Sequence, residues 1–196
     1  MELPQIEIKK ILYATDLSES SRYTFAHAIN MANRFGAGLI ILHVMTEIQN
    51  LDTSISYHIG KAQWEKIKQQ RQQDASETLI GKKRNDLAIR DALEKYCEGA
   101  NECLLERSFV TDEIIVERGD PAKHILKYSK DRNCDLIVVG SHGQGSLAGA
   151  MIGSTAKLVL KKSTVPVLIV RAPDEKWKGK SYDKRYRSPG DFRKRH

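Results

Sequence analysis

Five glycines, one histidine and a Ser–Thr pair lie between Gly140 and Thr155, a stretch with no aromatic or acidic side chain. Glycine lets a backbone turn sharply or pass close to a ligand that a Cβ atom would block. Hydroxyl groups and the unpaired N–H groups at the start of a helix can bind phosphate. We therefore tested the stretch against the spacings of known phosphate-binding loops.

Two common phosphate-binding patterns do not fit. The Walker loop requires a lysine directly after its second glycine, but Ser146 stands there. A dinucleotide fingerprint can be read at Gly143, Gly145 and Ala148. It lacks the acidic residue about 20 positions further on, because the strand-like segment Leu168–Val170 is apolar there.

A third pattern, G-x2-G-x9-G-[ST], fits at Gly140, Gly143, Gly153 and Ser154. With this motif the chain resembles the universal stress protein family. The resemblance extends to three further segments and covers most of residues 8–171; they read "ILYATDLSESSRYTFAHAINMANRFGAGLIILHV", "ERGDPAKHILKYSKDRNCDLIVVGSHG" and "STVPVLIVR".

The elements that must position these residues follow from hydrophobic periodicity. Short apolar runs alternate with longer amphipathic segments, which is typical of a parallel α/β sheet. Asp120 and Pro121, as N-cap and first helical residue, predict a helix start. Pro166 lacks an N–H group, so we expect the last strand to lie at an edge of the sheet. The predicted strands are Lys10–Asp16, Leu39–Met45, Glu113–Glu117, Asp135–Gly140 and Val165–Val170.

Two further helices are predicted beside the strands. Ser18 is the expected N-cap of the first, and Gly36 and Gly38 are expected to end it. The other helix covers Ser154–Ser163. The apolar face of the first helix is expected at Tyr23, Ala26, Ile29, Ala32 and Phe35.

The middle segment, residues 47–108, has no strand signal. We predict a helix over Gly60–Ile80 and, over Lys83–Ala100, either its continuation or a second helix after a break near Gly81. The run "KIKQQRQQD" is typical of a solvated helix face, and a helix that packs on a partner is the alternative.

Composition limits the domain count and the environment. The chain has 196 residues, 40% hydrophobic and 29% charged, which suits one core. We expect an α/β nucleotide-binding domain over residues 1–173 and a basic tail over 174–196. No apolar run is long enough for a signal peptide or a membrane span. Cys97, Cys103 and Cys134 lack disulfide or metal spacing, so we expect idle thiols in the cytoplasm.

The basic tail offers an alternative function. Residues 174–196 hold nine Lys or Arg and four Asp or Glu, so five of the seven net positive charges lie there. Trp177, Tyr182, Tyr186 and Phe192 are interleaved with them and could stack on bases. The tail is therefore either a solubilising extension or an adaptor for nucleic acid or an acidic partner.

The family resemblance implies a single-domain, open five-stranded parallel sheet in the order 3-2-1-4-5, with helices on both faces. It leaves the helical middle segment and the tail unexplained, and we expect the middle segment to form a helical insertion between strands 2 and 3. It places Asp16 opposite Gly140 at the switch point between strands 1 and 4. It also implies a homodimer through the fifth strand, Val165–Val170, and a client protein that the sequence does not identify.

The ATP-binding branch of the family further implies a cofactor and a site. ATP, with or without Mg²⁺, would contact Ala14, Thr15, Asp16, Val44, Val139, Gly140, His142, Gly143, Gly153, Ser154 and Thr155. Ala14 stands where many relatives carry proline, and His43 has no evident task. No base with an orienting partner is evident, so we expect a nucleotide-responsive regulator in which slow ATP hydrolysis stays open. A transferase or redox enzyme remains a third hypothesis and would need a second substrate pocket.

Overall fold

The computed structural model describes residues 3–46, 51–73, 81–102, 110–143 and 152–172. The predictions for residues 144–151, for Cys103 and for the tail concern residues outside these ranges. The elements, in chain order, are β1 (Lys10–Thr15), α1 (Ser21–Phe35), β2 (Gly38–Met45), α2 (Leu51–Ile59), α3 (Lys61–Gln73), α4 (Gly81–Glu102), β3 (Thr111–Arg118), α5 (Pro121–Asp131), β4 (Leu136–Gly140), α6 (Ser154–Lys162) and β5 (Val167–Val170).

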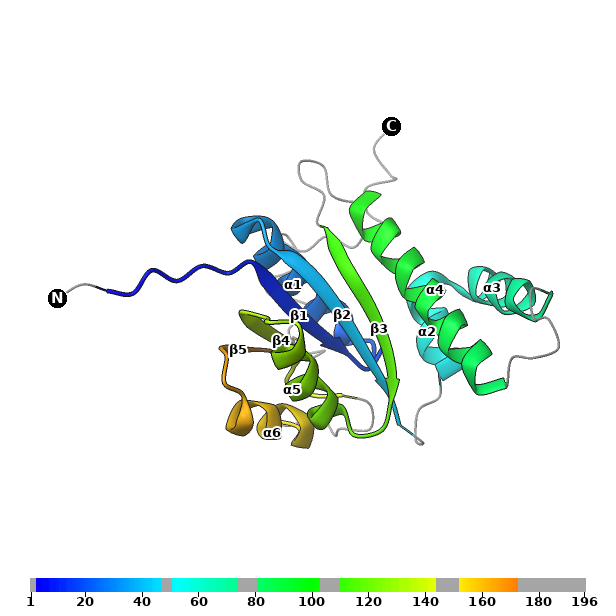
Figure 1. The fold of residues 1–196 in the computed structure, drawn as a ribbon. Helices are drawn as coiled ribbons and strands as arrows, with labels where there is room; N and C mark the ends of the chain where they lie inside the picture. The colour runs from blue at the N-terminus through cyan, green and yellow to red at the C-terminus, as the bar shows by residue number, and fades with distance from the viewer. Residues whose placement is uncertain (1–2, 47–50, 74–80, 103–109, 144–151, 173–196) are drawn as a thin grey trace, which may run out of the picture.

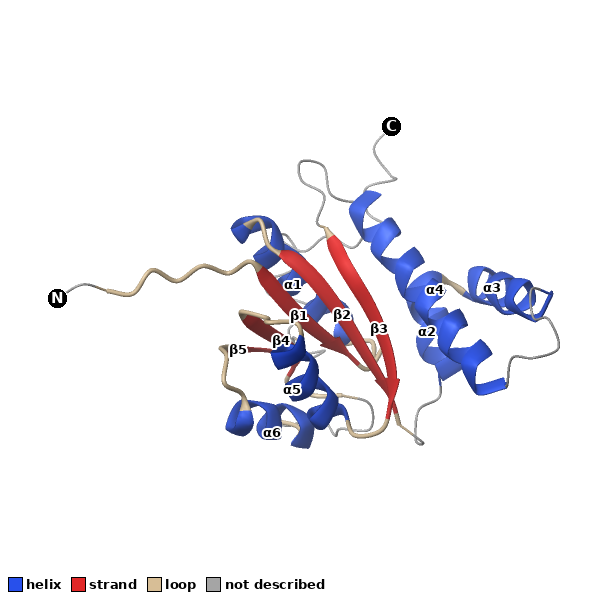
Figure 2. Cartoon of the chain, viewed as in Figure 1, coloured by secondary structure: helices blue, strands red, loops and turns tan. Residues whose placement is uncertain are grey.

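The five strands form one parallel sheet in the order β3-β2-β1-β4-β5, as predicted (Figure 2). In the centre, β1 pairs with β2 from Lys10 opposite Gly38 to Thr15 opposite His43. On its other side β1 pairs with β4, from Ile11 opposite Leu136 to Ala14 opposite Val139. The chain order reverses between β1 and β4, and such a switch point leaves a crevice at the carboxyl ends of the strands.

Helices cover both faces of the sheet (Figure 1). On β2, Leu39 and Ile41 pack in the core cluster that contains α1 and the helices of the middle segment, whereas Ile40 and Leu42 pack in the cluster under α5 and α6. A strand buried on both faces must be apolar nearly throughout, which explains the sequence of β2.

Helix α1 begins later than predicted, and its buried face shares Ile29 and Ala32 with the predicted one but not Tyr23, Ala26 or Phe35. Its N-cap is Ser20, not Ser18, and no side chain caps it. The carbonyl of Ser18 instead accepts a hydrogen bond from the N–H of Ser21 at 3.0 Å, because the chain turns at Leu17, which has a φ of 57°. Phe35 is 50% exposed, so it does not belong to the apolar face. The buried residues are Ser21, Thr24, Phe25, Ala28, Ile29 and Ala32.

Other boundaries confirm the prediction. Gly36 ends α1 in the left-handed conformation, with a φ of 63°. The Asp120 carboxylate caps α5 by accepting from the N–H of Lys123 at 3.0 Å, and Pro121 is the first helical residue. Strand β5 lies at the edge, and Pro166 just before it contributes only its carbonyl, to the N–H of Ile137 at 3.0 Å.

The middle segment forms three helices in the described residues. Helices α3 and α4 are separate and pack on each other through Arg71 and Asp91, so the alternative of a second helix is confirmed, and residues 74–80 between them lie outside the described ranges. Helix α2 was missed because its nine residues carry a weak periodicity; it is anchored by Ile55, which shares the core with Trp64 and Ile67 of α3. Lys66, Gln69 and neighbouring residues of α3 are exposed, as a solvated face should be.

Candidate functional site

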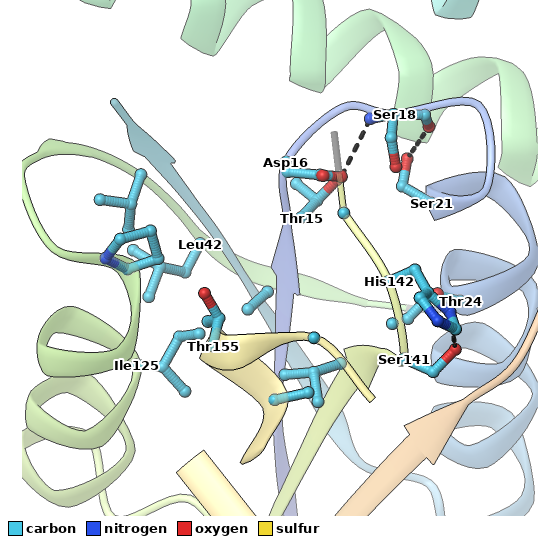
Figure 3. Close-up of a pocket in the computed structure, with 18 of the residues that line it drawn as sticks. Thr15, Asp16, Ser18, Ser21, Thr24, Leu42, Ile125, Ser141, His142 and Thr155 are labelled. Carbon is cyan, nitrogen blue, oxygen red and sulfur yellow. Dashed lines mark hydrogen bonds between the residues drawn. The ribbon is translucent and has the colours of Figure 1, made fainter. Parts of the chain in front are cut away.

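A cleft of about 370 Å³ lies at the carboxyl ends of β1 and β4 (Figure 3). The ends of β1, β2 and β4, the N-terminal turns of α1 and α5, and the start of α6 form its walls. Every residue predicted for the site lines this cleft: Ala14, Thr15, Asp16, Val44, Val139, Gly140, His142, Gly143, Gly153, Ser154 and Thr155. What they bind stays a prediction.

One wall of the cleft is apolar. Val44 and Val139 were predicted to line it, and the structure adds Leu42, Ile125 and Ala156. Leu42 and Ile125 lie together on one side of the opening (Figure 3). Leu42 precedes Val44 by two positions, so strand alternation could have identified it, whereas Ile125 depends on how α5 crosses the sheet. The wall is suited to a flat, apolar ring.

The opposite wall is polar. It contains the side chains of Asp16, Ser18, Ser21, Thr24 and Ser141. Oδ1 of Asp16 accepts from the N–H of Ser18 at 3.0 Å, and Oγ1 of Thr15 accepts from the N–H of Leu17 at 3.1 Å. These local bonds hold the loop after β1 in a tight turn. The sequence reasoning missed Ser21 and Thr24 because the predicted apolar face of α1 agrees with the buried one only at Ile29 and Ala32.

The glycines of the motif lie where the backbone passes close to its surroundings. A Cβ atom on Gly143 would lie 2.6 Å from Oδ2 of Asp16, and one on Gly140 would lie 3.2 Å from Oγ1 of Thr24. A Cβ on Gly153 would lie 3.3 Å from the carbonyl oxygen of Ser141. The loop after β4 is thus held against the loop after β1, and this contact closes one end of the cleft.

Helix α6 starts at the cleft. Gly153 is its N-cap, and no side chain caps the helix. Ser154 and Thr155 form its first turn and line the cleft with their neighbour Ala156. The N–H groups of a first helical turn and the helix dipole favour an anion. This end of the cleft therefore suits phosphate.

Two histidines lie near the cleft in different settings. Nδ1 of His142 lies 2.8 Å from Oγ of Ser141, and the ring lies beside Thr24 (Figure 3). His43 is fully buried behind the cleft, and its Nδ1 donates to the carbonyl of Thr15 at 2.9 Å. Burial lowers the pKa of His43 below its ordinary value, so the ring is neutral. His43, for which the sequence indicated no role, thus donates a hydrogen bond to the last residue of β1.

A serine–histidine contact joins the cleft to the middle segment. Oγ of Ser21 lies 3.0 Å from Nε2 of His58 on α2. This contact could not be predicted from the sequence, because α2 itself was not predicted. It is the point at which a helix outside the sheet layers reaches a residue that lines the cleft.

The described ranges contain no group of three His, Cys, Asp or Glu side chains that could hold a metal ion. They also contain no helix long and apolar enough to span a membrane. Cys97 and Cys134 are buried, free thiols. Burial raises the pKa of Cys97 to about 12 and that of Cys134 to about 11, so neither is a thiolate at neutral pH.

Comparison with known proteins identifies close relatives by sequence. The model of the universal stress protein family matches residues 7–171. Universal stress protein MJ0577 of Methanocaldococcus jannaschii is 30% identical over 164 residues, which cover 83% of this chain and 94% of that protein. Universal stress protein YxiE of Bacillus subtilis is 34% identical over 162 residues, covering 83% and 98%.

Solved structures share the fold. Universal stress protein UspA from Lactobacillus plantarum superposes with a TM-score of 0.57 at 20% identity, covering 85% of this chain and all of that one. The structure of MJ0577 gives a TM-score of 0.51 at 26% identity, covering 86% and 99%. The five-stranded parallel architecture is therefore common to these proteins.

Proposed function

This chain belongs to the universal stress protein family, and we propose that it is a nucleotide-binding member that holds ATP in the cleft between β1 and β4. One observation carries the proposal. The glycines of the motif and the uncapped start of α6 meet Asp16 in a single cleft. Backbone that passes this closely, beside a helix N-terminus, supports binding of a phosphorylated ligand.

In the proposed complex, different parts of the cleft contact chemically different parts of the ligand. The base packs on the apolar wall between Val44 and Ile125, because transfer of a ring from water to such a surface is favourable. The phosphates bind at the first turn of α6, where Ser154 and Thr155 supply hydroxyl and N–H groups. The Asp16 carboxylate accepts from the ribose hydroxyls. Mg²⁺, if it is bound, is held chiefly by the phosphates, as is usual for this ion.

The proposed role is nucleotide-responsive regulation in the stress response rather than rapid turnover. Asp16 already accepts a backbone N–H, and His142 is bonded to a neighbouring hydroxyl rather than to a carboxylate. Neither arrangement is that of an activated general base. Slow hydrolysis, the client protein and a cytoplasmic location remain parts of the prediction. The nucleic-acid alternative rests on the tail, which lies outside the described residues.

Thermal unfolding of the nucleotide-stripped protein with and without Mg-ATP tests the proposal. At about 100 times its dissociation constant, ATP stabilises by about 2.7 kcal/mol, which is a rise of roughly 5 to 10 °C for a chain of this size. Gly153→Val should abolish the rise, since the new side chain blocks the approach of phosphate. Gly99→Val, on an open surface of α4, is the matched control and should keep it. No rise in the stripped parent protein would refute the proposal.

We also propose that the chain forms a homodimer through β5. The edge position of this strand and the only partly buried Val167, Leu168 and Ile169 support it, because an apolar edge left uncovered invites aggregation. Sedimentation velocity at micromolar concentration should show a dimer that Ile169→Lys dissociates. Leu160→Lys, an exposed position on α6, should leave it intact. A monomeric parent protein would contradict the proposal.

A further inference from the structure

Hydrogen bonds and a cation–π contact join the N-terminal turn of α1 to the C-terminal turn of α2. The Arg22 guanidinium donates to the carbonyls of Tyr57 and His58, the latter at 3.5 Å, and lies 4.2 Å from the centre of the Tyr57 ring. The Tyr57 hydroxyl donates to Glu19 at 2.7 Å. An arginine on one helix thus satisfies the last carbonyls of another, which fixes α2 against the turn that carries Ser21.

His58 is held in one tautomer by this arrangement. Its Nδ1 lies 2.9 Å from the carbonyl oxygen of Ser54, which can only accept, so Nδ1 carries a proton. Burial, followed by the charge of Arg22, lowers the pKa of His58. The ring is therefore neutral at physiological pH, and its Nε2, which lies 3.0 Å from Oγ of Ser21, carries no hydrogen and can only accept.

The Ser21 hydroxyl has two alternative acceptors. Its Oγ lies 3.0 Å from Nε2 of His58 and 2.6 Å from the carbonyl oxygen of Ser18. A hydroxyl has a single hydrogen to donate. In this structure the hydroxyl donates to Ser18, the nearer acceptor, so the lone pair of a neutral Nε2 faces Oγ without a hydrogen between them. When His58 is protonated, Nε2 donates to Oγ while the hydroxyl still donates to Ser18, and every one of these groups has a partner.

We propose that His58 is a positioning residue for the nucleotide cleft, acting through the Ser21 hydroxyl, and that its protonation strengthens nucleotide binding. The inference rests on the proposed function. Protonation places a positive charge beside the hydroxyl of a residue that lines the cleft, and a nucleotide is an anion. Coupling between two sites is reciprocal, so bound nucleotide must in turn raise the pKa of His58.

Other charged and titratable groups also face this histidine. They come from every element packed around it, and the substitutions at His58 and Ser21 leave all of them in place. They are Asp16 after β1, Glu19 before α1, Arg22 on α1, His43 on β2, Tyr57 on α2 and Tyr96 on α4. Because the ligand titrates as well, only a difference between matched variants isolates His58.

The experiment is calorimetric titration of the full chain with Mg-ATP at pH 7.5 and pH 5.5. The parent protein should gain about fivefold more affinity on acidification than His58→Gln, the lower end of typical coupling between sites. Ser21→Ala keeps the imidazole but breaks the link, and should lose most of that gain. Tyr57→Phe removes the neighbouring bond to Glu19 without touching Ser21, and should behave as the parent protein.

The outcomes separate this inference from the function on which it rests. Equal pH dependence in the parent protein and in His58→Gln, with binding intact, would overturn the role of His58 alone. If Ser21→Ala kept the gain in affinity on acidification, the charge of His58 would act on the nucleotide directly and not through the Ser21 hydroxyl, which would overturn the positioning role. No binding by the parent protein at either pH would overturn the proposed function and this inference with it.

A second readout does not depend on any variant folding. The imidazole signals of His58, followed by NMR against pH, should titrate at a higher pH when Mg-ATP is present than when it is absent. An unchanged midpoint under saturating nucleotide would contradict the inference.

Discussion

At the residue scale, the cleft depends on backbone that passes close to side chains. Gly143 is the clearest case, because the atom it lacks would lie within 2.6 Å of the Asp16 carboxylate. Gly140 and Gly153 are less tightly restricted, at 3.2 and 3.3 Å from their neighbours. The motif therefore encodes the contact between two loops as well as the approach of a ligand.

Gly143→Ala should weaken Mg-ATP binding by displacing Asp16. We expect at least a tenfold loss of affinity, equivalent to about 1.4 kcal/mol, measured by calorimetry. Far-ultraviolet circular dichroism should be unchanged, since the residue lies outside the helices and strands. Parent-like affinity in this variant would mean that Asp16 can move without cost to the ligand.

The buried histidines make the protein less stable in acid. The pKa values of His43 and His58 are lowered in the folded state, whereas the unfolded chain has an ordinary value of about 6.5. Their contribution is thus fully present above pH 6.5 and is lost as the pH falls toward the lowered values. Each group contributes a slope of about 1.4 kcal/mol per pH unit in that window.

Urea unfolding at pH 7.5 and 5.5 measures this effect. His43→Asn keeps a donor for the Thr15 carbonyl but cannot titrate, so the difference in unfolding free energy between the two pH values should shrink. An undiminished difference would show that His43 is protonated without penalty in the folded state.

At the site, the glycine spacing and the place of Asp16 at the end of a strand were predictable from the residues themselves. The family resemblance supplied the rest, since it placed Asp16 opposite Gly140 and implied Val44 as a contact, and all of these residues line one cleft. Ser21, Thr24 and Ile125 could not be predicted, because their places depend on how α1 and α5 are rotated against the sheet. That rotation is a property of packing, which periodicity alone does not determine.

At the element scale, the strands were predictable from the sequence, their order followed from the family resemblance, and the helices were less predictable. Short apolar runs bounded by glycine and proline leave little choice for a buried strand. The predicted apolar face of α1 was right at Ile29 and Ala32 but wrong at Phe35, which is half exposed, and it missed Ser21 and Thr24, which are buried beside the cleft. Helix α2 was missed because contacts to α1 and α4, rather than its own pattern, stabilise it.

The cap of α5 can be tested directly. Asp120→Ala removes the carboxylate that accepts from the Lys123 N–H and should lower the unfolding free energy by about 1 kcal/mol. Asp131→Ala, at the last residue of the same helix, is the control and should not destabilise, since an acidic side chain there opposes the helix dipole. Similar losses in both variants would contradict the capping role.

At the scale of the whole molecule, the helices of the middle segment and the sheet share one core. Ile55, Trp64 and Leu93 belong to the same buried cluster as Tyr13 and Phe25. The Trp64 ring is 4% exposed, and its Nε1 donates to Asp52 at 2.8 Å. These contacts favour one cooperative unit rather than a body with a separate helical appendage.

Unfolding followed with two probes tests this cooperativity. The chain has two tryptophans, so Trp177→Phe leaves Trp64 as the sole fluorescent reporter of the middle segment. Its urea transition should coincide with that of circular dichroism, which reports the whole chain. Loss of the fluorescence signal at a lower urea concentration would show that the middle segment unfolds separately.

The pairing of β1 with β4 constrains when the molecule can mature during synthesis. Ile11 lies opposite Leu136, so the ribosome must produce more than half of the chain before the central strand gains its second neighbour. Contacts between such distant positions form late and slow the folding of a chain. The first strands emerge with an unpaired edge and without the cleft, because β4 and the start of α6 have not yet been synthesised. The proposed nucleotide would therefore stabilise only the finished protein.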